Sequence, residues 1–588
     1  MQRRHAHTLF LSLLTCMAGC GDGFLKFRWD LTEDKPDVEE GFVDATVEGI
    51  SDSKAYQDSI AAQGYIEGLR RMRVRGYGLV AGLGTTGSSE CPKNIRDRLV
   101  QEMYKRPEFS RRGLKPAVVS PEEVLRSLDT AVVVIEGEIP AAAQKGTTFD
   151  LTVRALAGTQ TTSLAGGSLY TSELFVYREN AAGGAVEGRA LATAAGPIFV
   201  NPFANKEDES ERQTTTMERQ GVILGGGTSI STRRIRFVLS TPSYRRARLI
   251  TDTANARFPG RGGVAKAESP SNITIRIPAA YQDDPFHFLA LFRHLYLPTR
   301  PGFLETRTQE LAKEILEPNA PHADIAIAWE GIGRTVLPTI QELYTDQRPY
   351  VRFYSALTGM RLGDGVAVDV VGEFALNPES PYRLTAIDEL GNASNSYRTS
   401  VVLRRLLSDK DPRIRVEAYE ALLPRRDEMI QTSKIGHSNF MLDLVDSPGP
   451  NLVYVRRTGD QRIALLGERM YCMPPVFYQD PNNLITINAE EDDRKLTLIR
   501  RSKFGDRISP PLPTDFELGS LIDMLGNDPK GTSEDHIHGL ALDYATITRT
   551  LHDLCESGGI NAKFMLQRNS TTEMFGPMTS TGRSESDL

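Results

Sequence analysis

The 588-residue sequence has few of the residues that cross-link a small fold. It contains five cysteines and no Cys-x-x-Cys pair. This composition argues against a disulfide-dense scaffold and gives a structural zinc site no support. A bridge between Cys472 and Cys555 is one option in an oxidising compartment, and beyond the N-terminal Cys16 and Cys20 it would leave Cys91 unpaired. Large hydrophobic cores must therefore hold the domains, and the length favours about four folding units.

The sequence also lacks an excess of positive charge. Lys and Arg number 69 against 76 Asp and Glu, which gives a net charge of −7 and a pI near 5.9. This balance argues against a nucleic-acid protein held by a general basic field. Arginines do gather locally, at 233, 234, 236, 245, 246 and 248. Such a patch suits an acidic subunit, anionic lipid or polysaccharide; otherwise it is a solvated face.

Motifs for catalysis are missing too, since neither GxSxG nor HExxH occurs. Gly82–Gly87 fits GxGxxG after a strand-like run, but no acidic strand end follows at the expected spacing. We interpret Gly76, Gly78, Gly82, Gly84 and Gly87 as positions where a strand bends and turns. Gly225–Ser229 is read as a turn or subunit contact, and the Glu534–His538 histidines as part of a solvated loop. The sequence therefore predicts no enzyme, no cofactor and no metal site.

Long apolar runs are confined to the N-terminus. Arg3 and Arg4 precede a short leucine-rich stretch and Ala18-Gly19-Cys20, which together predict a signal peptide over residues 1–20. Cleavage before a cysteine is typical of bacterial lipoproteins, so Cys20 is the predicted lipidation site. The alternative is an ordinary secretory signal in which Cys20 is incidental. Residues 21–60 are acidic and predict an N-terminal arm.

The chain then divides by composition and periodicity. Strand-like and helical stretches alternate over 61–204, residues 205–220 predict a mobile loop, and 221–300 follow a β-α-β-α pattern. In this part the predicted strands are Tyr77–Leu83, Ala131–Glu138, Thr148–Leu156, Leu169–Tyr177, Pro197–Val200, Arg234–Leu239 and Asn272–Ile277. The predicted helices are Lys93–Tyr104, Pro121–Leu128, Ser243–Ala256 and Pro285–Leu295.

Residues 320–430 change character because they repeat. Pro349, Pro381 and Pro412 lie 32 and 31 residues apart, and each is followed by an alanine, at 356, 386 and 418. Prolines in register at helix starts predict a helical-repeat solenoid of HEAT-like type, which is commonly a binding surface. Residues 440–567 return to strands with a final helix, and 568–588 predict a disordered tail. The predicted class is a multidomain α+β protein with an α-solenoid insert.

Several segments together resemble the bacterial flagellar P-ring protein family. The resemblance covers about residues 60–298 and is carried by Val74–Gly87, Ala131–Leu156, Ser163–Leu169, Gly188–Val200, Ser243–Phe258 and Ile273–Pro278. A fainter likeness resumes over Arg457–Ile487 and Leu540–Met565. The helical repeats then lie inside an otherwise P-ring-like chain, or replace part of it.

The resemblance implies a periplasmic, non-enzymatic subunit that forms a homo-oligomeric ring around the flagellar rod, at the peptidoglycan layer and beneath the L ring. The helical repeats would add a surface for a protein partner. For the ring interface we single out Gly76, Gly78, Gly82, Gly84, Gly87, Arg233, Arg234 and Arg236. The alternative is an envelope-anchored lipoprotein scaffold of the same fold, working outside the flagellum through its repeats.

Overall fold

The computed structural model describes residues 56–105, 120–176, 189–201, 218–298, 300–393, 396–436, 440–480, 483–501, 508–530 and 539–567. Several predictions fall outside these residues. They concern the signal peptide with Cys20, the acidic arm before Tyr56, residues 205–217 of the predicted loop, the Glu534–His538 pair of histidines and the tail from 568.

The first unit is a closed barrel of six strands in the order β2-β3-β4-β7-β6-β5, in which all neighbouring strands are antiparallel. Its strands are β2 (Met72–Ala81), β3 (Thr130–Ile139), β4 (Thr148–Ala155), β5 (Ser168–Val176), β6 (Ala190–Pro197) and β7 (Gln220–Ser229). Alternate apolar residues such as Val133 and Ile135 fill its interior. Helices α2 (Lys93–Tyr104) and α3 (Pro121–Val124) cover Leu79 and Val132 outside.

The second unit is a four-stranded sheet in the order β1-β8-β10-β9, packed against two helices. Its elements are η1 (Ala61–Gln63), β1 (Gly64–Glu67), β8 (Ile235–Leu239), α5 (Tyr244–Arg257), β9 (Ala265–Ala267), β10 (Asn272–Ile275), η3 (Ala279–Tyr281) and α6 (Pro285–His294). The predicted boundary at residue 221 needs correction. Strand β7 closes the barrel, while β1, from the start of the chain, pairs with β8 of this sheet.

A layer of helices follows. It consists of α7 (Phe303–Glu314), α8 (His322–Ile332), η4 (Arg334–Val336), α9 (Leu337–Gln341), η5 (Glu342–Thr345), α10 (Pro349–Arg361), α11 (Gly365–Leu376), α12 (Arg383–Asn392), α13 (Tyr397–Leu406) and α14 (Pro412–Leu422). Pro349 and Pro412 open α10 and α14, as predicted. Pro381 does not open α12, because it lies in a turn in which the Arg383 N–H donates to the Ser380 carbonyl at 3.2 Å; Tyr382 of this turn stacks on Phe353 at 4.5 Å between ring centroids.

The C-terminal unit contains two sheets, ordered β11-β12-β14-β13-β19 and β15-β16-β17-β18. Its elements are β11 (Ile430–Ile435), β12 (Phe440–Asp446), β13 (Leu452–Val455), β14 (Arg462–Gly467), β15 (Val476–Gln479), β16 (Ile485–Ala489), β17 (Leu496–Arg500), β18 (Leu512–Thr514), α15 (Leu518–Gly526), α16 (Tyr544–Glu556) and β19 (Lys563–Leu566). Strand β13 is buried on both faces: Leu452 and Tyr454 join the core of the helical layer, while Val453 and Val455 face α15 and α16.

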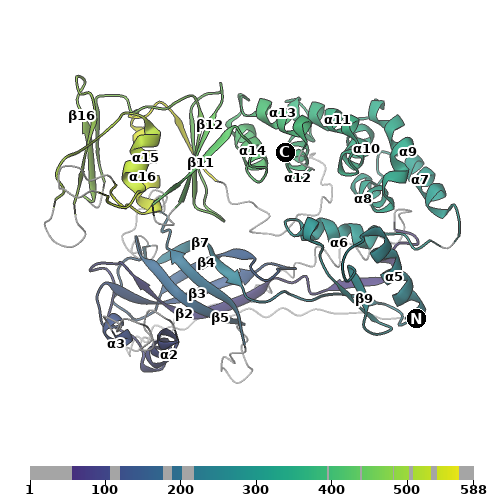
Figure 1. Ribbon diagram of the computed structural model, residues 1–588, viewed down its shortest axis with the longest axis horizontal. Helices are drawn as coiled ribbons and strands as arrows, with labels where there is room; N and C mark the ends of the chain where they lie inside the picture. Colours follow the sequence, from purple (N-terminus) through teal and green to yellow (C-terminus); the bar gives the residue numbers. More distant parts are fainter. Residues whose placement is uncertain are drawn as a thin grey trace, which may run out of the picture.

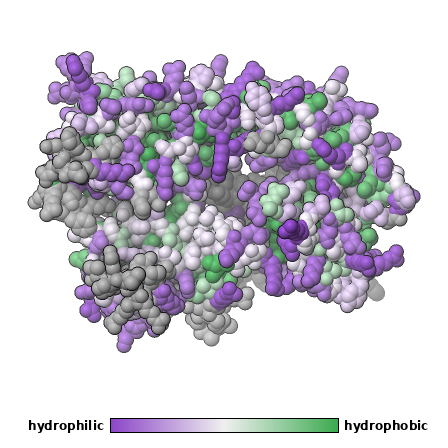
Figure 2. Space-filling view, viewed as in Figure 1, coloured by the Kyte–Doolittle hydropathy of each residue, from purple (hydrophilic) through white to green (hydrophobic). Residues whose placement is uncertain are grey.

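The four units form two rows (Figure 1). The barrel and the α5–α6 unit make one row, and the C-terminal unit and the helical layer make the other. Core residues tie the rows at both ends, because Phe199 and Leu224 of the barrel side pack with the C-terminal unit and Tyr56 and Tyr296 pack with the helices. Hydrophilic side chains cover most of the visible surface (Figure 2). None of the described helices has the length and apolar character needed to cross a membrane.

Candidate functional site

Two of the predicted interface glycines lie in the barrel wall. Gly76 and Gly78 are buried in β2. A Cβ at Gly76 would lie 2.5 Å from the carbonyl oxygen of Glu173, and one at Gly78 would lie 2.7 Å from side-chain atoms of Ile135 and Leu169. At Gly76 the backbone of β5 leaves no room for a side chain, whereas at Gly78 the ends of neighbouring side chains would have to shift. Both residues shape the barrel, and their role in a ring interface stays a prediction.

The remaining three glycines form the turn after β2. Gly82 and Gly84 have φ of +84° and +72°, a region that favours glycine. The Gly84 N–H donates to Asp129 Oδ1 at 2.7 Å, and a Cβ at Gly87 would meet the Thr130 carbonyl oxygen at 2.3 Å. The backbone donor of the GxGxxG segment is thus taken by a carboxylate of the same chain. Its role in a ring interface stays a prediction.

The structure divides the predicted arginine patch. Arg233 donates from Nη1 to the Pro140 carbonyl at 3.0 Å, and burial lowers the pKa of its guanidinium. Arg236 lies 4.0 Å from Glu67 across the β1–β8 pair. Arg234 is exposed, as are Arg245, Arg246 and Arg248 on α5. The exposed basic residues therefore belong mainly to helix α5.

Gly225–Ser229 was predicted as a turn or subunit contact. The turn is wrong, because the segment is the end of strand β7, and the subunit contact stays a prediction. Its pairing with β4 shifts register between Phe149 and Leu151, so Gly225 can adopt a φ of +59°. The Gly225 N–H donates to Asp150 Oδ1 at 2.5 Å. The bulge makes room for Asp150, whose second partner comes from the C-terminal unit.

Asp150 joins the barrel to the C-terminal unit. The Gly459 N–H lies 3.1 Å from Oδ1 and 3.2 Å from Oδ2 of this carboxylate. Burial raises the pKa of Asp150, the two backbone donors lower it in part, and the nearby charge of Asp460 raises it further. Two N–H groups that would otherwise lack an acceptor are satisfied by one side chain.

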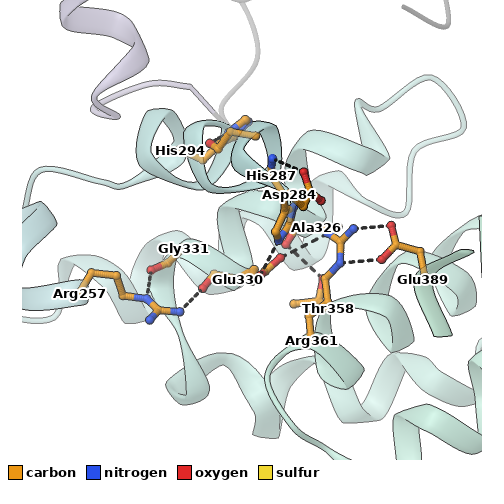
Figure 3. Close-up of polar contacts among 11 residues, drawn as sticks. Arg257, Asp284, His287, His294, Ala326, Glu330, Gly331, Thr358, Arg361 and Glu389 are labelled. Atoms are coloured by element: carbon orange, nitrogen blue, oxygen red, sulfur yellow. Dashed lines mark hydrogen bonds and ion pairs between the residues drawn. The ribbon is translucent and has the colours of Figure 1, made fainter. Parts of the chain in front are cut away.

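A polar site that joins several helices lies where α6 meets α8 (Figure 3). Glu330 of α8 is buried and contacts an imidazole and a guanidinium: His287 Nε2 of α6 lies 2.9 Å from Oε1, and Arg361 Nη1 of α10 lies 3.3 Å from Oε2. Burial opposes the charge of Arg361, yet Glu389 and Glu330 together raise the pKa of its guanidinium. We call Glu330, His287, Arg361 and Glu389 the junction cluster.

Backbone contacts complete this junction. Arg257, the last residue of α5, donates from Nε to the Gly331 carbonyl at 2.9 Å and from Nη2 to the Glu330 carbonyl at 2.8 Å. Because these carbonyls end α8, the cation also opposes the negative end of the helix dipole. Both helices of the second unit thus hold α8 (Figure 3).

A parallel contact lies one helix length away. His294 Nε2 at the end of α6 lies 3.6 Å from Asp324 at the start of α8, and its ring centroid lies 4.7 Å from that of Tyr56. Burial alone would raise the pKa of Asp324, but His294, Tyr56 and Arg293 outweigh it and lower that pKa. Helix α6 therefore carries a histidine toward each end, and each faces a carboxylate of α8.

The helical layer joins the C-terminal unit through Arg415 of α14. This buried guanidinium donates to the carbonyls of Leu407, Pro450 and Leu466 and to the hydroxyl of Ser447. Sequence reasoning missed Arg415, although an arginine on the apolar side of a predicted helix was a visible signal. It likewise missed His287 and Glu330, because no local spacing relates residues that lie 43 positions apart.

The cysteines of the described residues are all free thiols, so the optional Cys472–Cys555 bridge is not formed. Burial raises the pKa of both Cys472 and Cys555 to about 12. Over the described ranges, no three His, Cys, Asp or Glu side chains gather as a metal site would require.

Known proteins match one part of the chain. The family model of the flagellar P-ring protein matches residues 60–301. The chain is 29% identical over 238 residues to the flagellar P-ring protein of Rhodopseudomonas palustris (strain BisB5), covering 39% of this chain and 58% of that protein. It is 27% identical over 243 residues to that of Thermotoga maritima, covering 39% and 64%. With that of Caulobacter vibrioides it shares 26% over 220 residues, covering 36% and 53%.

The chain thus spans between half and two thirds of the length of these curated relatives. The matched residues begin just before η1 and β1 of the second unit. They continue through the barrel and end in the loop after α6. The fainter likeness over Arg457–Ile487 and Leu540–Met565 lies beyond them and stays a prediction. The resemblance over about residues 60–298 is confirmed: this segment is similar to flagellar P-ring proteins, and the helices from Phe303 to Leu422 are an addition to it.

Proposed function

We propose that this protein is a structural, non-enzymatic subunit of the periplasmic P ring of the bacterial flagellar basal body. The observation that carries the proposal is the family match over residues 60–301. It ends after α6 and takes in the whole barrel together with the α5–α6 unit, so it corresponds to complete folding units rather than a fragment of one. The homo-oligomeric ring would surround the rod beneath the L ring, next to peptidoglycan, and support motility.

The helical layer would be a HEAT-like surface for a protein partner. Ala356, Ala386 and Ala418, the alanines of the repeat, are all buried, as the packing of stacked helices requires. Val366, Leu384 and Tyr397 are exposed on α11, α12 and α13. These are the side chains through which a protein partner would make apolar contacts.

Lipidation at Cys20 would anchor each subunit to the envelope and keep the ring near a membrane. Arg234 remains the residue of the predicted interface best placed to contact a neighbouring subunit, because it is exposed beside the second sheet. The glycines would act indirectly, by setting the shape of the barrel that is assembled.

Electron microscopy of isolated envelopes tests the proposal, with a gold label on a tag at the C-terminus. Label on a ring around the flagellar rod, together with loss of motility on deletion of the gene, is the expected result. The second candidate function is a lipoprotein scaffold outside the flagellum, which the added helical layer favours. Label spread over the envelope with motility intact would overturn the ring role and support that scaffold.

A further inference from the structure

Helix α5 carries an exposed basic face on which, among the described residues, one arginine meets a carboxylate. We define this basic face as Tyr244, Arg245, Arg246, Arg248 and Leu249. All five are exposed, with 76% of Tyr244 and 39% of Leu249 accessible. Arg248 meets one carboxylate, Asp252, at 3.6 Å. The helix lies at the outer end of its row (Figure 1), where the visible surface is largely hydrophilic (Figure 2).

The spacing of these residues forms a single stripe. Positions 244, 245, 248, 249 and 252 face outward, while Ala247, Ile250 and Ala254 are buried against the sheet. Residues three and four positions apart share a helix face. The stripe therefore combines guanidinium groups with an exposed ring and an exposed leucine, a combination that fits an acidic peptide with interspersed apolar side chains.

The chain itself contains such a peptide. Residues 30–48, which precede the described residues, hold eight Asp and Glu against one lysine. Between the acidic residues stand Leu31, Val38, Phe42 and Val43. Since the net charge of the whole chain is −7, this short segment carries a surplus as large as that of all 588 residues. Its charge and apolar pattern are complementary to the basic face.

The start of the described chain lies in the right place for this contact. Tyr56 packs on His294 of α6, and the Ile60 N–H donates to the Leu295 carbonyl at 2.9 Å. Helices α5 and α6 pack on the same sheet. Eight residues, from 48 to 56, can extend about 26 Å, and a 14-residue helix such as α5 is about 21 Å long. The acidic segment can thus reach the basic face of its own chain.

We infer that residues 30–48 bind the basic face of α5 within the same chain, as an intramolecular acidic arm. The inference is independent of the ring role proposed above. The contact would neutralise the exposed arginines and fix the exit path of the N-terminal segment, and with it the distance between the folded units and any anchor at Cys20.

Photo-crosslinking in the intact protein tests this inference. A photoreactive phenylalanine replaces Tyr244 in one variant and Phe477, which is 69% exposed in the C-terminal unit, in a control variant. Mixing isotope-labelled and unlabelled protein separates links within a chain from links between chains. We expect Tyr244 variants to link to residues 30–48 of the same chain, and Phe477 variants not to do so.

Charge reversal supplies the second arm of the test. Arg245→Glu with Arg248→Glu should lower the cross-link yield about tenfold, as should about 0.5 M salt, because the attraction is screened. Adding Glu39→Lys with Glu40→Lys should restore the yield. Unchanged far-ultraviolet circular dichroism shows that each variant is folded. Links only between chains, no link to residues 30–48, or a yield indifferent to charge reversal would each overturn the inference.

Discussion

At the scale of single residues, a few polar side chains join parts of the fold that disulfides would join in a cysteine-rich protein. Glu330 is the clearest case, because three separate helices contact its side chain or carbonyl. Buried ion pairs of this kind are costly to break, since removing one partner leaves the other charged and desolvated. The junction cluster therefore decides how firmly the helical layer is held to the α5–α6 unit.

Replacement of Glu330 tests how much the junction cluster contributes to the stability of the folded protein. Glu330→Ala leaves His287 and Arg361 without a shared carboxylate, and we expect it to lower the free energy of unfolding by about 3 kcal/mol. Glu379→Ala is the control, because Glu379 is exposed on the same layer and should change stability by less than about 0.5 kcal/mol. Urea denaturation measures both. Equal effects would contradict the role given to the junction cluster.

A second residue prediction concerns acid. His294, Tyr56 and Arg293 lower the pKa of Asp324 below its ordinary value of about 3.9. The ionised carboxylate therefore stabilises the folded state above that value, and this stabilisation is lost as pH falls through the lowered pKa. Asp324→Asn should flatten the loss of stability below about pH 4, measured by urea denaturation at several pH values. The prediction would be contradicted if the variant and the original protein lost stability equally below about pH 4.

The turn glycine Gly87 gives a third prediction. A Cβ there would lie 2.3 Å and 2.5 Å from two backbone carbonyl oxygens, which cannot move aside as a side chain can. We expect Gly87→Ala to cost about 2 kcal/mol or more, as overpacking does. Gly260→Ala is the matched control, because nothing lies within 4 Å of its Cβ position. Thermal denaturation compares the two, and similar midpoints would argue against the close approach.

At the scale of elements, helix α14 connects two kinds of structure. Its outer end belongs to the helical layer, while Arg415 and Tyr419 reach β12, β14 and the loop between β12 and β13. One planar guanidinium serves four acceptors, which the point charge of a lysine cannot do. The position of the five-stranded sheet against the helices rests on this side chain.

Arg415→Lys should therefore loosen the contact between α14 and β14 without unfolding either unit. Hydrogen exchange followed by mass spectrometry should show at least about tenfold faster exchange in β14, consistent with a local opening that is easier by about 1.4 kcal/mol. Arg413→Lys on the exposed side of α14 should leave exchange unchanged. Protection of β14 retained in both variants would contradict the assignment.

The elements also show what sequence patterns can and cannot predict. Lys93–Tyr104 was predicted as a helix and has those bounds, because its apolar spacing and its flanking prolines are local signals. Strands β3, β4 and β8 were found within one residue of their predicted starts for the same reason. The pairing of β2 with β5, which closes the barrel, could not be predicted from the sequence, because strand partners distant in sequence leave no local pattern. The junction cluster was missed on the same grounds.

At the scale of the whole molecule, the two rows are joined at both ends and by different chemistry. The α6–α8 end uses histidine–carboxylate contacts beside the packing of Tyr56 and Tyr296, whereas the barrel end uses Phe199, Leu224 and the single carboxylate of Asp150. Asp150→Ala should therefore free the Gly225 and Gly459 N–H groups and speed hydrogen exchange around Gly459, with the α6–α8 end unaffected. Slow exchange around Gly459 in that variant would show that the apolar contact suffices.

The makeup of the largest core sets an order of events during synthesis. Tyr56 shares that core with Leu452 and Tyr454, some 400 positions later in the chain, and β19 completes the sheet beside β13 only at residues 563–566. A nascent chain that has delivered the barrel and the helices can already pack Tyr56 on His294, but it still lacks Leu452 and Tyr454 of the same core. Completion of this core therefore depends on strands made late in translation, and any truncation upstream of β19 produces a chain with an open edge at β13 and an unfinished core.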